Sequence, residues 1–122
     1  MKYKVFLDDI LNPSDVLDRM SDSSHLRKYE DKDWIVARSY EDFVNVVAKN
    51  HSEKKTLEFV SFGHDLSERT NDKTGLDCAA WLSAFSVELN QVFPTYEIHS
   101  SNPNGKQEIG KYIKRFCNGY YG

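Results

Sequence analysis

Four short apolar runs alternate along this chain with longer stretches of helical pattern, and this alternation constrains the fold more than any other feature. The runs have the composition of buried strands and cover residues 3–7, 34–37, 57–62 and 96–99. Apolar residues at helical spacing follow each run, and the clearest case is residues 76–92. Strands that alternate with helices pair in parallel through right-handed crossovers and carry helices on both faces. The sequence therefore predicts an α/β fold.

Residues that cap or break helices set the expected helix ends. Ser14 is expected to cap a short helix that runs to Met20. Ser39, with Asp42 three residues later, is a weak capping signature for the second helix. Pro94 cannot continue a helix, so we expect it to stop the third one.

The last helix has a start signal, an apolar face and a stop signal. Asn104 and Gln107 form a plausible capping box at its start. Its apolar face is expected to bury Tyr112 together with the neighbouring isoleucine and phenylalanine residues. Asn118-Gly119 is expected to end the helix.

The composition fits one globular domain. The chain has 122 residues, of which 39% are hydrophobic and 29% charged, and its net charge is −3. A negative net charge gives no overall electrostatic attraction for nucleic acid. The N-terminus lacks the apolar stretch of a signal peptide, and no apolar run is long enough to span a bilayer. We therefore expect a single domain over residues 1–122, located in the cytoplasm, with no membrane or DNA partner.

The cysteine and tryptophan residues are expected to serve packing rather than chemistry. Cys78 and Cys117 match no metal or redox spacing, so we expect buried thiols. Trp34 and Trp81 are expected to be core aromatics rather than platforms for stacked bases.

Three of the apolar runs end abruptly in acidic or imidazole side chains. The first ends in Asp8-Asp9, the third in His64-Asp65 and the fourth in His99. Because the carboxyl ends of parallel strands form the edge where open α/β sheets bind ligands, we expect these side chains to lie close together. Clustered carboxylates need a cation or protons to offset their repulsion. Asp8, Asp9 and Asp65 would suit Mg²⁺ or Mn²⁺.

The two histidines at this edge favour general acid–base catalysis. His64 and His99 stand beside carboxylates, and imidazole changes its charge near neutral pH. Two alternatives remain open: the pair could ligate a transition metal together with Asp65, or each could be an ordinary strand-end histidine satisfied by its neighbours.

The turn after the fourth run has the pattern of an anion site. It leads into a helix N-terminus, whose backbone N–H groups attract phosphate. Its candidate substrate-binding residues are Ser100, Ser101, Asn102, Asn104, Gly105 and Lys106. Arg38, just past the second run, could clamp a phosphate through two hydrogen bonds. Plain helix capping and a solvated arginine would explain the same residues.

Five segments, in order along nearly the whole chain, resemble one family. They are Phe6-Leu7-Asp8-Asp9, residues 38–43, residues 61–66, residues 74–77 with Trp81-Leu82, and residues 99–105. The chain resembles the cyclic-phosphate-processing receiver domains, a divergent branch of the response-regulator receivers. The resemblance implies a receiver-like (flavodoxin-like) three-layer sandwich with a truncated, mainly four-stranded parallel sheet in the order 2-1-3-4.

The resemblance also implies a function. The family is expected to handle cyclic phosphates of nucleotides or RNA ends. In receivers the acidic pocket holds Mg²⁺, and the aspartate of the third strand, here Asp65, accepts a phosphoryl group. This sequence departs from a signalling receiver because it stops after the helix that follows the fourth run, so that a fifth strand and the lysine after it are not expected. Lys106 is the nearest basic substitute, and His64 and His99 are also unlike a signalling receiver.

These features favour a phosphoesterase-like enzyme in which His64, Asp65 and His99 are catalytic. Its partner would be a phosphate-containing small molecule, a nucleotide or an RNA end. Two alternatives stay open: a non-catalytic binder or sensor of a nucleotide signal, and a phospho-accepting receiver module that uses Asp65.

Overall fold

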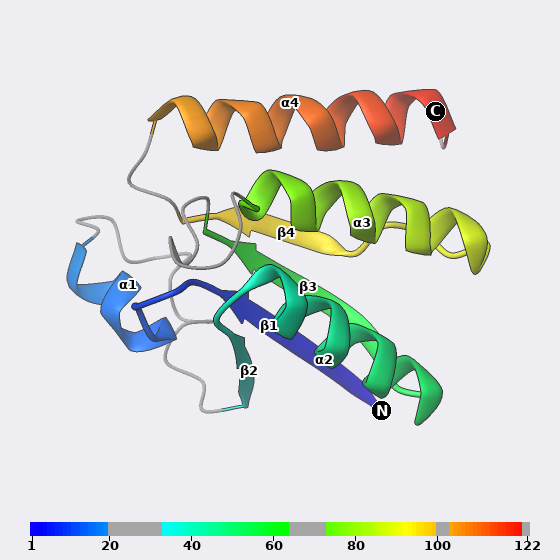
Figure 1. Ribbon diagram of the computed structural model, residues 1–122, viewed down its shortest axis with the longest axis horizontal. Helices are drawn as coiled ribbons and strands as arrows, with labels where there is room; N and C mark the ends of the chain where they lie inside the picture. The colour runs from blue at the N-terminus through cyan, green and yellow to red at the C-terminus, as the bar shows by residue number, and fades with distance from the viewer. Residues whose placement is uncertain (20–32, 64–72, 100–102, 121–122) are drawn as a thin grey trace.

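Strands and helices alternate along the chain, as the apolar pattern predicts. The computed structural model describes residues 1–19, 33–63, 73–99 and 103–120. The elements are β1 (Lys2–Leu7), α1 (Pro13–Arg19), β2 (Trp34–Ala37), α2 (Tyr40–Ser52), β3 (Thr56–Phe62), α3 (Gly75–Glu88), β4 (Thr95–Ile98) and α4 (Pro103–Tyr120). The strands form one parallel, four-stranded sheet in the order β2-β1-β3-β4 (Figure 1). The expected α/β, receiver-like fold and strand order are confirmed.

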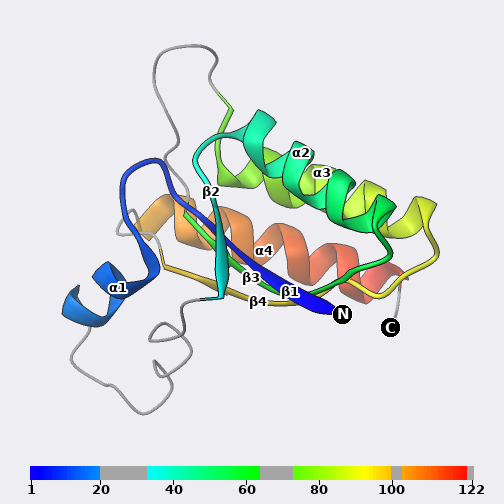
Figure 2. The same cartoon turned by 90° about the horizontal axis from the view of Figure 1, so that it is seen from below.

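The strand order decides which face of the sheet each helix covers. The step from β1 to β2 runs one way across the sheet, whereas the steps to β3 and then β4 run the other way. Because crossovers are right-handed, α1 lies on one face, and α2 and α3 lie on the other. Figure 2 shows α1 on the opposite side of the strands from α2 and α3. On its face Phe6, Val16 and Trp34 form a small cluster.

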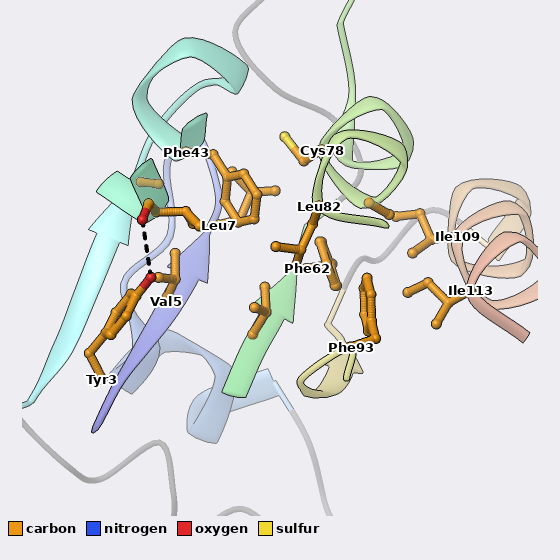
Figure 3. Packing of buried hydrophobic residues seen from close by; sticks show 14 residues of the cluster. Tyr3, Val5, Leu7, Phe43, Phe62, Cys78, Leu82, Phe93, Ile109 and Ile113 are labelled. Atoms are coloured by element: carbon orange, nitrogen blue, oxygen red, sulfur yellow. Dashed lines mark hydrogen bonds between the residues drawn. The ribbon is translucent and has the colours of Figure 1, made fainter. Parts of the chain in front are cut away.

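The larger core lies between the sheet and helices α2, α3 and α4 (Figure 3). Val5 and Leu7 face this core whereas Phe6, between them, faces α1, because side chains alternate along a strand. A buried side chain of this size contributes about 1.5–3 kcal/mol. The helix residues that meet the strands include Phe43, Cys78, Leu82, Ile109 and Ile113.

The cysteines and tryptophans lie close to where they were expected. Cys78 and Trp34 are buried, and Trp81 and Cys117 are partly buried against the larger core. Both cysteines are free thiols. Burial raises the pKa of the Cys78 thiol, so it stays protonated and unreactive at neutral pH.

Two helix ends differ from the sequence prediction, although the cap at Ser39 is confirmed by its hydrogen bond from the Asp42 N–H (3.1 Å). Helix α1 begins at Pro13 rather than behind a Ser14 cap, because proline suits the first helical position. Helix α3 ends at Glu88 rather than Val92. Asn90 has a left-handed φ of 56°, which stops the helix before Pro94 is reached.

Helix α4 also differs from its prediction. It begins at Pro103, so Asn104 lies inside the first turn and does not cap it, and it continues through Asn118-Gly119. None of the described glycines has a positive φ, so Gly119 does not turn the chain. Tyr112 is 38% exposed, because the buried face is centred on Ile109 and Ile113. No helix in the described parts of the chain is long and apolar enough to cross a membrane.

The backbone at the C-terminal end of α2 leads to one prediction about stability. Lys54 has a left-handed φ of 62°, and its N–H donates to the His51 carbonyl (2.9 Å) while the Lys55 N–H donates to that of Asn50 (3.0 Å). This is the position where glycine is preferred. Lys54→Gly should raise the free energy of unfolding by about 0.5 kcal/mol, since the relief of strain exceeds the entropy lost. Urea denaturation measures it; Lys49→Gly, inside α2, should instead cost about 0.5–0.8 kcal/mol.

Candidate functional site

The carboxyl edge of the sheet brings Asp8 and His99 to one place. Each lies one residue beyond its strand, and the backbone ladder continues through them. The Asp8 N–H donates to the Ala37 carbonyl (3.1 Å), the Gly63 N–H to that of Leu7 (2.7 Å), and the His99 N–H to that of Phe62 (3.0 Å). Asp8, Gly63 and His99 therefore stand side by side at the end of three neighbouring strands. The sequence predicts this edge for Asp8 and His99.

Asp8 and His99 form a hydrogen bond that passes over β3. Neighbouring strands lie about 4.8 Å apart, so β1 and β4 are separated by roughly 10 Å. The His99 Nε2 nevertheless lies 2.9 Å from the Asp8 Oδ2. Gly63 makes this approach possible, because a Cβ at that position would lie 3.1 Å from the Asp8 Oδ2, 3.2 Å from the His99 Nε2 and 2.7 Å from the Leu7 carbonyl oxygen.

The imidazole of His99 is almost completely buried. Its Nδ1 lies 2.7 Å from the Ser61 hydroxyl, and its ring stacks on Phe6 with centroids 4.3 Å apart and an interplanar angle of 9°. Phe6 and Ser61 precede Asp8 and Gly63 by two residues, so they share their face of the sheet. The His99 side chain is 1% exposed. Its two ring nitrogens are thus both engaged inside the protein.

Asp8 is held as a carboxylate. Burial would raise its pKa, but hydrogen bonds from His99 and from the Leu11 and Ile10 N–H groups, together with the charge of His99, lower the pKa below its ordinary value of 3.8. The two N–H groups donate to Oδ1 at 2.8 and 2.9 Å. Since a carboxylate only accepts, the His99 Nε2 carries a proton and donates to Oδ2, while the Nδ1 of the same ring forms the hydrogen bond with the Ser61 hydroxyl. About one acceptor position of Oδ2 is left over.

This pKa shift predicts an acid-dependent loss of stability. A carboxyl whose pKa is lowered by folding stabilises the native state above the unfolded pKa, and that contribution is lost as the pH falls through the folded pKa. The free energy of unfolding should therefore decrease below about pH 4, and less steeply in Asp8→Asn. Urea denaturation at a series of pH values measures both slopes. Parallel pH curves for wild type and Asp8→Asn would show that Asp8 is not the group responsible.

Arg38 stabilises the loop that follows β1 and contains Asp8 and Asp9. Its Nη1 donates to the carbonyls of Leu11 (2.6 Å) and Asp8 (3.3 Å), and its Nη2 donates to the Asn12 side chain (2.5 Å). The Asp42 carboxylate accepts from the Arg38 N–H at 2.9 Å. A guanidinium has five N–H donors, so these bonds leave donors for a phosphate. Phosphate binding by Arg38 stays a prediction beside this observed bracing role.

The structure places other predicted site residues only in part. Asp9 follows Asp8 and is half-buried, and in the first turn of α4 Gly105 is buried while Asn104 and Lys106 are exposed. Within the described ranges no group of three histidine, cysteine or acidic side chains could hold a metal ion. The predicted site residues that lie outside those ranges are His64, Asp65, Ser100, Ser101 and Asn102.

Three further residues shape the site, and the sequence did not single them out for it. Ser61 fixes the His99 ring, Phe6 stacks on it, and Gly63 leaves room for it. One signal was available: Ser61 is a small polar residue inside an apolar strand, on the same face as Gly63. Two small residues in alternation make space above a strand for a side chain from its neighbours.

The site lies within a segment that matches a known family. No curated protein and no solved structure matches the chain. The family model of the cyclic-phosphate processing receiver domain matches residues 3–115, which include Asp8, Gly63 and His99. Because that match covers most of the chain and agrees with the strand order, this protein belongs to the family of cyclic-phosphate processing receiver domains.

Proposed function

We propose that this protein is a phosphoesterase that opens a cyclic phosphate in a nucleotide or at an RNA end. The observation that carries the proposal is the hydrogen bond between Asp8 and His99 across β3. A buried carboxylate–imidazole pair stabilises a fold no better than apolar side chains of similar size would. Polar groups arranged in this way at the ligand-binding edge of an α/β sheet are typical of functional sites.

The acidic groups of this edge suit a divalent cation. The Asp8 Oδ2 has an acceptor position left over, and oxygen donors of this kind are what Mg²⁺ and Mn²⁺ prefer. In the proposal Asp8, Asp9 and Asp65 hold the ion. Its charge would offset the charge that develops on the phosphoryl oxygens.

The proton transfers are assigned to His64, and His99 has a positioning role. In the proposed reaction water adds to phosphorus, one ring P–O bond breaks, and the leaving oxygen takes up a proton, which gives a phosphomonoester. His64 would exchange protons directly with the water and the leaving oxygen. Because both nitrogens of His99 are hydrogen-bonded, His99 would act through Asp8, whose carboxylate it orients. Arg38 and the turn at residues 100–106 would orient the phosphate.

A substrate screen tests the proposal. The purified protein is incubated with 2′,3′- and 3′,5′-cyclic nucleotides and with RNA ending in a 2′,3′-cyclic phosphate, with and without Mg²⁺ or Mn²⁺. Phosphorus NMR should show a phosphomonoester from at least one substrate, and only with metal present. Tight binding without turnover would contradict the enzyme and support a nucleotide sensor. A phosphoryl adduct on Asp65 after treatment with acetyl phosphate would support a phospho-accepting receiver instead.

A further inference from the structure

A cavity lies at the end of the sheet opposite to the Asp8–His99 pair. It has a volume of about 310 Å³ and lies among the first residues of β1 and β3, the last turns of α2 and α3, and the segment before β4. Both helices run toward this end of the sheet, where the N-terminus lies (Figure 1). At about 3.3 Å per residue, Tyr3 in the cavity wall is roughly 17 Å from Asp8 along β1. The cavity is therefore separate from the candidate active site.

The floor of the cavity is apolar but contains two hydroxyl groups. Val47 and Leu82 are each 2% exposed, and Ser86 is 4% exposed. Ser86 lines the cavity, and its hydroxyl makes no hydrogen bond to another described residue. The Tyr3 hydroxyl donates to the Val47 carbonyl at 3.5 Å, the long limit for such a bond (Figure 3). Both hydroxyls are able to serve a ligand.

The charges at the cavity favour an anion. Lys55 and His51 line it, and none of the described residues around it is an aspartate or a glutamate. The Lys55 Nζ lies 3.2 Å from the Glu53 Oε1, in a partly exposed pair that a buried carboxylate could displace. The last carbonyls of α2 and α3 would repel an anion if they were bare. They are capped instead, for example by the Gln91 N–H, which donates to the Ser86 carbonyl at 2.8 Å.

We infer that this cavity is a second binding site, which takes a small carboxylic acid with an apolar ring. The volume lies at the lower end of the range for small-molecule pockets, about 300–1,000 Å³, so one or two rings fit. Tyr3, His51 and Phe85 supply ring surfaces around the body of the ligand, and His51 already packs edge-on against Phe85 with centroids 5.5 Å apart. The carboxylate lies toward Lys55 at the outer end.

The probes are benzoate, phenylacetate and indole-3-acetate, with phenylacetamide as the uncharged comparison. Titration followed by backbone NMR shifts should show saturable binding at or below about 1 mM for at least one acid. The shifts should centre on Thr56, Phe85 and Gln91 and spare Asp8. No binding by any of the three acids, or shifts centred on Asp8, would overturn the inference.

Three variants test whether the probe binds in this cavity. Ser86→Leu fills the cavity and should weaken binding at least tenfold, whereas Lys55→Gln should weaken the acid about tenfold and leave the amide unchanged. Lys49→Gln removes an exposed charge from the same helix outside the cavity and should bind like wild type. If Ser86→Leu does not fold, Lys55→Gln still decides. Equal binding of acid and amide, or wild-type affinity in Lys55→Gln, would overturn the assignment of the carboxylate.

Discussion

Asp8→Asn should lower kcat/KM for cyclic-phosphate cleavage by about 100-fold or more and remove the stabilisation by Mg²⁺ or Mn²⁺. Asparagine has the shape of aspartate, and its amide oxygen can still accept the N–H groups of Ile10 and Leu11. The loop should therefore keep its path while the site loses its negative charge. Kinetics on the substrate found in the screen measure the first effect, and melting temperatures with and without metal measure the second.

The matched control for this variant is Glu41→Gln. Glu41 is an exposed acid in the first turn of α2, which begins at the same edge of the sheet. Its replacement removes the same charge and should leave the rate and the metal response within about twofold of wild type. Wild-type kinetics in Asp8→Asn, or an equal loss in Glu41→Gln, would exclude Asp8 from the proposed reaction.

The strands could be predicted from the sequence because their chemistry is local. The apolar run 34–37 coincides with β2, β1 and β3 each begin one residue earlier than predicted, and β4 is shifted by one residue at both ends. Short runs of β-branched and aromatic residues are a local signal, so the pattern and the structure give nearly the same boundaries. The alternation of runs and helices then gives parallel strands, because right-handed crossovers leave few other arrangements.

Helix ends were less predictable, since several residues near each end can cap it. Asn12, Pro13 and Ser14 all favour a helix start, and α1 begins at Pro13. The Asn12 N–H donates to the Asp15 carboxylate at 2.7 Å in the first turn. Several neighbouring residues with similar preferences therefore left the exact end open.

The sequence predicts where the site lies, but not how its side chains are arranged. Polarity at the strand ends indicated that Asp8 and His99 share one edge, which the structure confirms. It did not indicate a direct bond, because β3 stands between their strands. That bond depends on the absence of a side chain at Gly63, for which the alternation of the small residues Ser61 and Gly63 was the available signal. The roles of His64 and Asp65 stay predictions.

The same Gly→Ala change should have opposite effects in two helices. In α3, a Cβ on Gly75 would overlap the Gly63 carbonyl oxygen, lie 2.9 Å from its carbonyl carbon and lie 3.1 Å from the Ile109 Cδ1. In α4, a Cβ on Gly110 would meet only the Ile98 Cδ1, at an ordinary 3.6 Å. Alanine is the better helix former by about 0.8–1 kcal/mol, so Gly110→Ala should gain roughly that amount. Gly75→Ala should lose about 1–3 kcal/mol net, because backbone atoms cannot move aside as a side-chain tip can.

The close packing of Gly75 on Gly63 also affects the candidate site. Gly63 is held between the start of α3 and the Asp8–His99 hydrogen bond, so a shift of its backbone away from an alanine at position 75 would press on that bond. Urea denaturation should show Gly110→Ala above wild type and Gly75→Ala below it. NMR of the folded Gly75→Ala protein should also show a changed His99 imidazole, which Gly110→Ala should leave unchanged. If both variants were stabilised alike, α3 would not pack on Gly63 as closely as described, and the bond would not depend on that helix.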